Sequence, residues 1–334
     1  ILVKKVIYIN FLVVIAIFIF LEIIIRLTNV VGLQGYDENA FYSDNNITFS
    51  KPNKSFKVFG KKSKTDNFGF RIPLSKFSYK KNKNHTLVLG DSVTYGVGVE
   101  EQNSFIGILR QKYKNDNLLN SAIFGHNIES YLYILNKNNI KFKNQIDNVI
   151  IFLCLNDIVP HQGVVFKDKS NENKIKKNFL DSYLRDSFIF KLNIFLREKS
   201  SLFVLLKSVF TNPVKRHYDY MRALYNDEIN LIEFENHVNK IKKITKDANF
   251  NSKFILLPYA HQVNNNCEDE FLKPQNDIIK IFNKLDLELI DFTQEFCDTS
   301  NKKQLFLPYD PVHLSKYGHK VVSDLLISNK IIAN

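Results

Sequence analysis

The chain has 334 residues, of which 45% are hydrophobic and 24% charged, which is typical of globular protein and excludes a wholly disordered chain. Three cysteines are too few for a disulfide scaffold, and they lack the spacing of a metal site. The net charge of +12 is spread along the whole chain, and no nucleic-acid-binding motif accompanies it, so nucleic acid is not an expected partner.

The N-terminus predicts a membrane anchor. Residues 6–25 are apolar apart from Asn10 and Glu22, and at about 1.5 Å per residue they are long enough to cross a hydrocarbon core of about 30 Å. A cleaved signal sequence is the alternative, but it would typically be shorter and end at a small-x-small site, which is missing here. We therefore expect an uncleaved transmembrane helix over residues 6–28.

The charges on either side of this helix predict its orientation. Lys4 and Lys5 outweigh Arg26 on the other side, so the positive-inside rule places residues 1–5 in the cytoplasm. The expected protein is single-pass, with the rest of the chain periplasmic or extracellular.

Residues 29–84 form a polar linker and lead-in segment, rich in asparagine, lysine and serine. Its one dense motif is 67–71, Asn-Phe-Gly-Phe-Arg. A glycine turn that packs Phe68 and Phe70 on the body is favoured over a contact between Arg71 and a substrate.

From residue 85 to 330, short apolar runs alternate with helical patterns, as in a three-layer, doubly wound, flavodoxin-like α/β fold with a five-stranded parallel sheet. The predicted strands are 86–89, 118–123, 149–155, 254–257 and 287–290. A helical insertion over about 160–230 interrupts the pattern with apolar stretches at 188–195 and 202–210. A lid over the active site and plain structural packing are equal alternatives for it.

Two polar motifs predict nucleophilic catalysis. Ser92, in Gly90-Asp91-Ser92, follows a buried strand, and Asp310 precedes His313 by three residues near the C-terminus. A serine hydroxyl needs an imidazole to take its proton, and the imidazole needs a carboxylate to orient it. In open α/β sheets, such groups gather at the carboxyl ends of strands.

Two more residues follow strands and could stabilise an oxyanion. Gly125 offers a backbone N–H and Asn156 a side-chain amide, both suitable donors to the charge that develops in ester chemistry. A turn glycine and a polar loop start are the structural alternatives.

In these motifs the chain resembles the SGNH hydrolases, the superfamily of GDSL-type esterases and lipases. The resemblance covers roughly residues 85–328, with Val93 where the family commonly has leucine and Cys154 where the block before Asn156 usually has glycine. It implies Ser92 as nucleophile, His313 as general base and Asp310 as its orienting carboxylate. It also implies an oxyanion hole made of the Ser92 N–H, the Gly125 N–H and the Asn156 amide.

The Gly-x-Ser-x-Gly elbow of α/β-hydrolases is the usual alternative setting for a triad serine. It is not present, because Thr94 occupies the position of the second glycine.

The expected function is therefore a serine esterase that acts on O-acyl, for example acetyl, esters of carbohydrate or cell-envelope substrates through an acyl-enzyme. An O-acyltransferase that modifies a surface polysaccharide and a non-catalytic glycan-binding protein are the alternatives. No metal or organic cofactor is expected, and the oligomeric state is left open.

The remaining candidates have less specific signals. Cys267 and Cys297 could form one bridge outside the cytoplasm, whereas Cys154 lies in an apolar strand and is expected as a buried thiol. His126 and His261 lie at the catalytic edge, but hydrogen-bonded surface histidines are favoured there over cleft residues.

Overall fold

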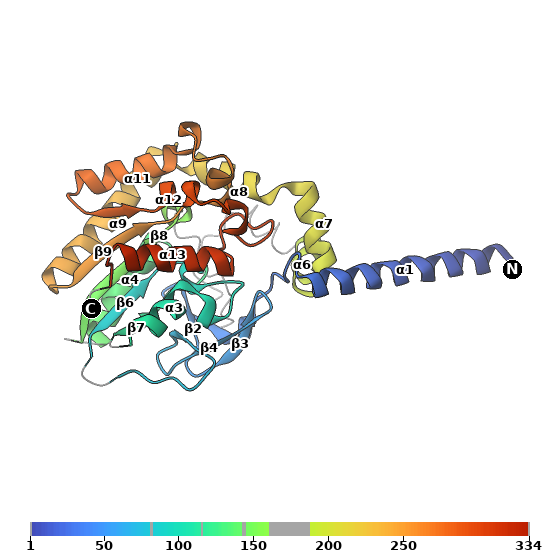
Figure 1. The fold of residues 1–334 in the computed structure, drawn as a ribbon, viewed down its shortest axis with the longest axis horizontal. Helices are drawn as coiled ribbons and strands as arrows, with labels where there is room; N and C mark the ends of the chain where they lie inside the picture. Colours follow the sequence, from blue (N-terminus) through green and yellow to red (C-terminus); the bar gives the residue numbers. More distant parts are fainter. Residues whose placement is uncertain (1, 81–82, 115, 142–144, 160–187, 333–334) are drawn as a thin grey trace.

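The computed structural model describes residues 2–80, 83–114, 116–141, 145–159 and 188–332. Helix α1 (Leu2–Thr28) projects from the body and leaves nearly all of its side chains exposed (Figure 1). Among the described residues it is the one helix long and apolar enough to cross a membrane, a property that membrane spans and signal sequences share.

Five strands make the central sheet, mostly from runs of buried apolar residues, as in sheets covered on both faces. They are β6 (His85–Leu89), β7 (Asn117–Asn120), β8 (Ile146–Leu153), β9 (Asn251–Leu256) and β10 (Leu289–Asp291). All pairs are parallel, in the order β10-β9-β8-β6-β7. This is the flavodoxin-like order, so the predicted fold class is confirmed.

Strand β7 ends at Asn120, earlier than the predicted residue 123. Ser121 still donates its N–H to the Val88 carbonyl at 3.1 Å, but Ala122 and Ile123 leave the sheet and pack with Tyr95 in a second apolar cluster. The first part of the apolar run 118–123 thus belongs to the sheet, and its last part belongs to the second apolar cluster.

Helices cover both faces of the sheet (Figure 1). On one face α3 (Phe105–Lys112) packs against α13 (Lys316–Ser328), and on the other α4 (Ile128–Lys141) packs against α9 (Glu228–Asp247). Ser104 caps α3 by accepting the Gly107 N–H, as expected from its position before the apolar pattern. The other helices of the core are α2 (Ser92–Tyr95), α10 (Ala260–Asn264), α11 (Lys273–Lys284) and α12 (Thr293–Asp298).

The lead-in segment folds into two small antiparallel sheets. They are formed by β1 (Phe41–Asp44) with β2 (Ile47–Ser50), and by β3 (Ser55–Val58), β4 (Lys61–Thr65) and β5 (Arg71–Ile72). Phe41, Phe56 and Val58 from these strands pack against Tyr95 and Phe124 of the body. The lead-in segment therefore covers the chain that follows Ser92.

The insertion contributes α6 (Phe188–Lys199), α7 (Ser201–Thr211) and α8 (Pro213–Leu224), while its first part, 160–187, lies outside the described residues. Helices α6 and α7 lie beside the inner end of α1, and α8 packs on the body. Tyr218 and Met221 of α8 are buried in the main core. Helix α8 of the insertion thus packs on the core.

The cysteines differ in state. Cys267 and Cys297 form a disulfide with a Cα–Cα distance of 6.1 Å, which answers the question that their spacing left open. Cys154 is a buried thiol, as predicted.

Candidate active site

The site lies where β6 and β8 are neighbours although β7 follows β6 in sequence. At such a switch point the connections leave to opposite sides, and a crevice opens at the carboxyl ends of the two strands. Ser92 follows β6 and Asn156 follows β8, so the sheet itself brings these two predicted residues to one crevice.

A tight turn presents Ser92 at the start of α2. Gly90 is required there, because a Cβ would meet the Thr94 side chain at 2.2 Å. Asp91 caps the helix by accepting the Val93 N–H at 2.8 Å. Ser92 is 9% exposed, so the turn holds its hydroxyl in a nearly closed site.

Asn156 is fixed by hydrogen bonds at both ends of its amide. Its Nδ2 donates to the Asp91 carboxylate at 3.0 Å, and its Oδ1 accepts from the Tyr259 hydroxyl at 2.7 Å. Burial raises the pKa of Asp91, and the Asn156 hydrogen bond opposes this rise. Since Nδ2 carries two hydrogens, one remains to serve an oxyanion.

Cys154, which stands at the family's glycine position, adopts an extended backbone with φ −127° and ψ 168°. Any residue adopts this conformation, so the turn to Asn156 needs no glycine here. Asp157 stabilises the turn by accepting the Cys154 N–H at 2.7 Å.

Asp310 and His313 form the predicted pair. His313 Nδ1 lies 2.8 Å from Asp310 Oδ2, while Asp310 Oδ1 accepts the N–H groups of Val312 and His313 at 2.9 and 2.8 Å. The Ala260 N–H donates to the Pro311 carbonyl at 2.9 Å, which ties this loop to the start of α10, the helix that follows β9. The pair is thus held at the same edge of the sheet as Ser92.

The electrostatics of the pair suit a general base. Burial alone would lower the pKa of His313, but the Asp310 carboxylate outweighs it and raises the pKa above its ordinary value. Burial alone would raise the pKa of Asp310, but the His313 imidazole and the two N–H donors lower it. The Asp91 carboxylate, next to Ser92, also raises the pKa of His313, by less than Asp310 does.

His313 Nε2 is buried and has no hydrogen-bond partner among the described residues. It therefore makes no hydrogen bond to Ser92 Oγ in this structure. Catalytic hydrogen bonds are often long or poorly aligned before a substrate is bound, so a missing bond at Nε2 does not exclude His313 as the base. The ring of Phe59 contacts the imidazole in a T-shaped arrangement, with centroids 5.4 Å apart and an interplanar angle of 71°.

Gly125 lies in a turn after β7 and has a φ of 79°, a conformation that favours glycine. Gly125 itself is exposed, but both of its neighbours are buried: Phe124 packs in the second cluster, and His126 Nε2 lies 2.7 Å from the Thr48 carbonyl of the lead-in segment. His126 is hydrogen-bonded, as expected, but it is 2% exposed, so the expectation of a surface position is wrong: the lead-in segment covers it.

Three aromatic residues near the pair were not singled out from the sequence. Tyr259 bonds Asn156, His217 of α8 stacks on Tyr259 with centroids 5.6 Å apart, and Tyr36 is affected by the charges of Asp310 and Asp91. Burial lowers the pKa of His217. For these three residues, the one sequence signal of a place at the site is that Tyr259 directly follows the fourth core strand.

His261 packs between the rings of Tyr218 and Phe271, with centroid distances of 4.8 and 5.1 Å. Its Nδ1 lies 3.3 Å from Asn265 Nδ2. It is hydrogen-bonded, as expected from the sequence, but half-buried between two aromatic rings rather than at the surface.

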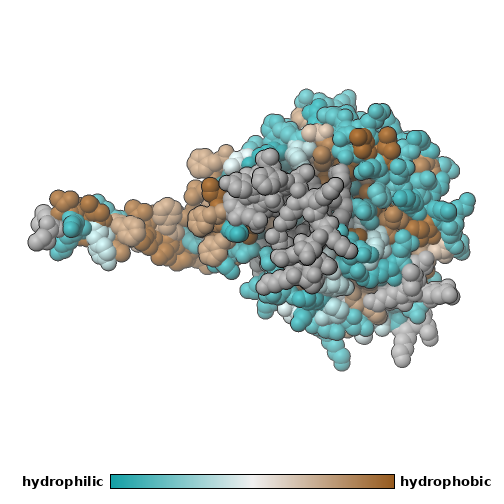
Figure 2. All heavy atoms as spheres, turned by 180° about the vertical axis from the view of Figure 1, so that it is seen from behind, coloured by the Kyte–Doolittle hydropathy of each residue, from teal (hydrophilic) through white to brown (hydrophobic). Residues whose placement is uncertain are grey.

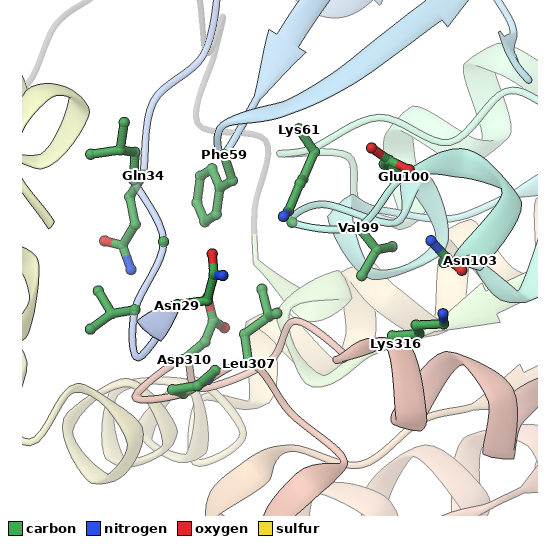
Figure 3. A pocket seen from close by; sticks show the side chains of 15 residues that line it. Asn29, Gln34, Phe59, Lys61, Val99, Glu100, Asn103, Leu307, Asp310 and Lys316 are labelled. Atoms are coloured by element: carbon green, nitrogen blue, oxygen red, sulfur yellow. The ribbon is translucent and has the colours of Figure 1, made fainter. Parts of the chain in front are cut away.

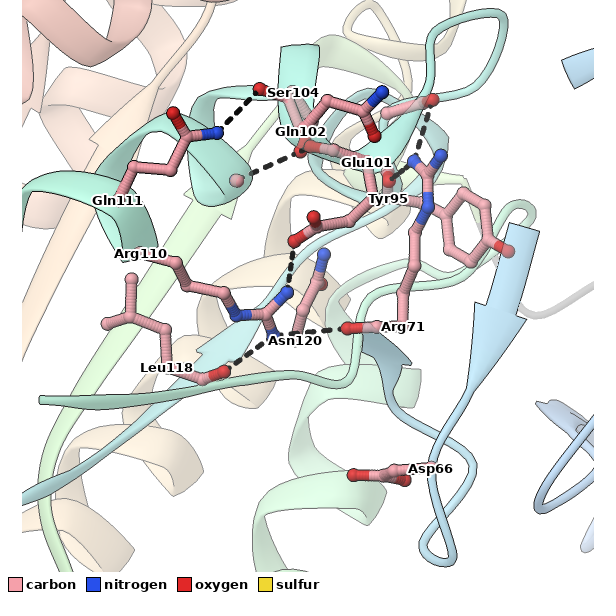
Figure 4. A network of polar contacts seen from close by, with 12 residues as sticks. Asp66, Arg71, Tyr95, Glu101, Gln102, Ser104, Arg110, Gln111, Leu118 and Asn120 are labelled. Carbon is pink, nitrogen blue, oxygen red and sulfur yellow. Dashed lines mark hydrogen bonds and ion pairs between the residues drawn. The ribbon is translucent and has the colours of Figure 1, made fainter. Parts of the chain in front are cut away.

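Arg71 is buried and supports the backbone after Ser92. Its guanidinium donates to the carbonyls of Tyr95, Gly96 and Val99, the last two at 2.8 and 2.7 Å (Figure 4). Gly69, two residues earlier, has a φ of 87°, so the lead-in motif is a glycine turn, as predicted.

A cavity of about 450 Å³ adjoins Asp310 (Figure 3). Phe59 and Leu307 line it near the carboxylate, and Gln34 lines it from the segment that follows α1. Among the described residues, no three His, Cys, Asp or Glu side chains gather as a metal-ligand set.

No family model matches the chain. A curated relative, an uncharacterized protein of Mycoplasma pneumoniae, is 38% identical over 90 residues; the match covers 25% of this chain and 10% of that protein. The chain thus matches only a tenth of the length of that relative.

Among solved structures, the chain is similar to the esterase EstA from Pseudoalteromonas, with 14% identity and a TM-score of 0.43 over 75% of this chain and 100% of that one. The acetyl xylan esterase AlAXEase has 16% identity and a TM-score of 0.43, and the match covers 74% of this chain and 99% of that one. A lipolytic protein of the G-D-S-L family from Veillonella parvula has 14% identity and a TM-score of 0.39, and the match covers 74% of this chain and 98% of that one. The fold assignment rests on the strand order, and the site on the residues described above.

Proposed function

We propose that this chain is a membrane-anchored serine esterase that cleaves O-acyl esters of carbohydrate or cell-envelope substrates. The observation that carries the proposal is the Asp310–His313 pair, whose Nε2 is left without a partner at the sheet edge where Ser92 begins α2. A binding protein has no need of a nucleophile, a base and an orienting carboxylate at one edge.

In the proposed reaction Ser92 Oγ attacks the ester carbonyl carbon while His313 Nε2 takes the hydroxyl proton. Asp310 stabilises the imidazolium that forms. The N–H groups of Ser92 and Gly125 and the second amide hydrogen of Asn156 would hold the oxyanion. Cleavage of the carbonyl–oxygen bond releases the alcohol, which receives the proton from His313, and water then attacks the acyl-enzyme by the same route.

The proposed location places α1 in a membrane and the body outside the cytoplasm. The exposed apolar surface of α1, with Lys4 and Lys5 at one end, supports this orientation. The Cys267–Cys297 disulfide supports it independently, because such bonds persist in oxidising compartments.

Acyl transfer to a sugar hydroxyl is the second candidate. It is favoured by the low exposure of the site, where the Ser92 residue is 9% and the His313 side chain 12% exposed. A site that limits water lets another acceptor compete for the acyl-enzyme.

The test uses the full chain in detergent with p-nitrophenyl acetate, and with a fluorophosphonate label that reacts with activated serines. Ser92→Ala should abolish labelling and lower turnover by at least about a thousandfold. Ser208→Ala, at a serine of similar burial on α7, is the matched control and should keep both.

Turnover that survives in Ser92→Ala would overturn the assignment of the nucleophile. A folded parent chain with neither turnover nor labelling would instead support the glycan-binding alternative. Faster release of p-nitrophenol on addition of a sugar oligomer, with acylated sugar as product, would identify the transferase.

A further inference from the structure

Helices α6 and α7 expose a large apolar surface. Helix α6 buries none of its residues, and Phe210 at the end of α7 is 84% exposed. The exposed apolar side chains of the two helices are Phe188, Ile189, Phe190, Leu192, Ile194, Phe195, Leu206, Val209 and Phe210. So much exposed apolar surface in one hairpin indicates a binding surface rather than ordinary solvent exposure.

The hairpin is fastened to the domain end of α1. The Glu22 carboxylate accepts from the Ser200 hydroxyl at 2.8 Å and from the N–H groups of Ser201 and Leu202 at 2.9 Å, and so caps α7. Arg26 donates to the Lys199 carbonyl at 2.6 Å. These contacts hold the hairpin at a fixed position along α1.

Apolar packing joins the same parts. Ile25 of α1, Val31, and Leu202 and Val204 of α7 form one buried cluster. In Figure 2 the apolar surface of the projecting helix continues onto the adjoining part of the body.

That position matches the outer boundary of a bilayer. About 20 residues of helix span a hydrocarbon core of about 30 Å. Counted from Lys5, the last basic residue before the apolar run, the outer boundary falls near Ile25. The contacts of the hairpin with Glu22, Ile25 and Arg26 lie at this level.

We propose that α6 and α7 form an interfacial hairpin that inserts its apolar side chains into the outer leaflet beside α1. The occupant of this surface is the lipid bilayer, because the surface is continuous with α1 at the membrane boundary. Lys191 and Lys199 on α6 are exposed and can reach anionic headgroups while the aromatic side chains enter the acyl region. The proposal rests on the membrane anchoring given under the proposed function.

The absence of tryptophan from the sequence allows a direct test, because one introduced tryptophan is the only such fluorophore. The full chain is reconstituted in phosphatidylcholine and phosphatidylglycerol vesicles with or without bromine on the acyl chains. Phe195→Trp and Phe210→Trp probe α6 and α7. Ile232→Trp on α9 is the matched control, since Ile232 is 54% and Phe195 55% exposed. Phe18→Trp reports on α1 itself.

We expect brominated lipid to quench Phe195→Trp and Phe210→Trp strongly, as it quenches Phe18→Trp, and to leave Ile232→Trp unchanged. Quenching of Phe18→Trp without quenching of the hairpin probes would overturn the interfacial hairpin and leave the anchor in place. No quenching of Phe18→Trp would show that the anchor itself fails. Hairpin probes shielded from acrylamide but not quenched by bromolipid would assign the surface to a second copy or another protein.

Discussion

Arg71 is buried and stabilises the backbone behind Ser92. Its three carbonyl acceptors belong to the end of α2 and the loop that follows. Arg110 in turn donates to the Arg71 carbonyl at 3.0 Å, so the support is itself held in place. An arginine suits this role because its planar fork presents several donors at once.

Arg71→Lys should therefore loosen the turn that carries Ser92. A lysine ammonium cannot reach all three carbonyls, and leaving buried acceptors unpaired costs about 1–3 kcal/mol of unfolding free energy. We expect this loss in urea denaturation, together with a lower kcat and a nearly unchanged KM. Arg222→Lys on α8, at a half-buried arginine, is the control. A variant as stable and active as the parent would contradict this role.

Asp310→Asn tests the pair through pH. Asp310 raises the pKa of His313 above its ordinary 6.5, so kcat/KM of the parent should rise with pH through a midpoint above that value. Without the carboxylate the midpoint should move to lower pH, and the rate should fall by about 10³- to 10⁴-fold because the imidazole loses its orientation. An unchanged midpoint in a full pH–rate profile would show that Asp310 does not act on the base.

The same shifts define a window of stability. The raised pKa of His313 contributes stability below pH 6.5 that is lost as pH rises through its folded pKa. The lowered pKa of Asp310 contributes stability above pH 3.8 that is lost as pH falls through its folded pKa. Both contributions are therefore present between these two ordinary values.

At the scale of single residues, the sequence predicted those site residues that interact with near neighbours in the chain. Asp310 and His313 are three residues apart, so their pairing could be expected without the fold. The contacts of Tyr259 with Asn156 and of Phe59 with His313 join residues more than a hundred positions apart, and only tertiary structure brings them together.

At the scale of elements, the lead-in segment is part of the site. Phe59 lies in the turn between β3 and β4 and has a φ of 47°. Its ring contacts His313 and lines the cavity beside Asp310. Sequence reasoning predicted the core strands because burial on both faces gives continuous apolar runs. It found none of the lead-in strands, since strands of two to five residues that also expose polar side chains leave too short a pattern.

Phe59→Ala should enlarge the cavity and change substrate preference. We expect kcat/KM for p-nitrophenyl butyrate to rise relative to acetate, because the acyl group gains space next to the imidazole. Phe49→Ala, at another half-buried aromatic of the lead-in segment, contacts His126 but does not line the cavity and is the control. An equal change in both variants would mean that the lead-in segment was destabilised as a whole.

At the scale of the whole molecule, the Cys267–Cys297 disulfide closes a stretch with a sequence separation of 30 residues between α10 and α12. Cross-links of this kind stabilise a fold mainly by restricting the unfolded chain, typically by about 2–4 kcal/mol. The double substitution of both cysteines by serine should lower the unfolding free energy by about this amount while p-nitrophenyl acetate turnover at 25 °C is retained. Equal stability in the oxidised parent and the variant would contradict the cross-link.

The connection between α1 and the body is short. Gln34 accepts from Arg197 at 2.8 and 3.0 Å, and Val31 is buried against α7, so the chain is fixed again within a few residues of Thr28. In the proposed anchored state, this short connection would hold the body at a nearly constant height above the bilayer. The crevice would then reach only substrates within a thin layer next to the lipid. The rate at which the crevice meets a substrate would depend on the number of ester groups per unit area of membrane. A polymer would be modified only along the stretch that lies within this layer.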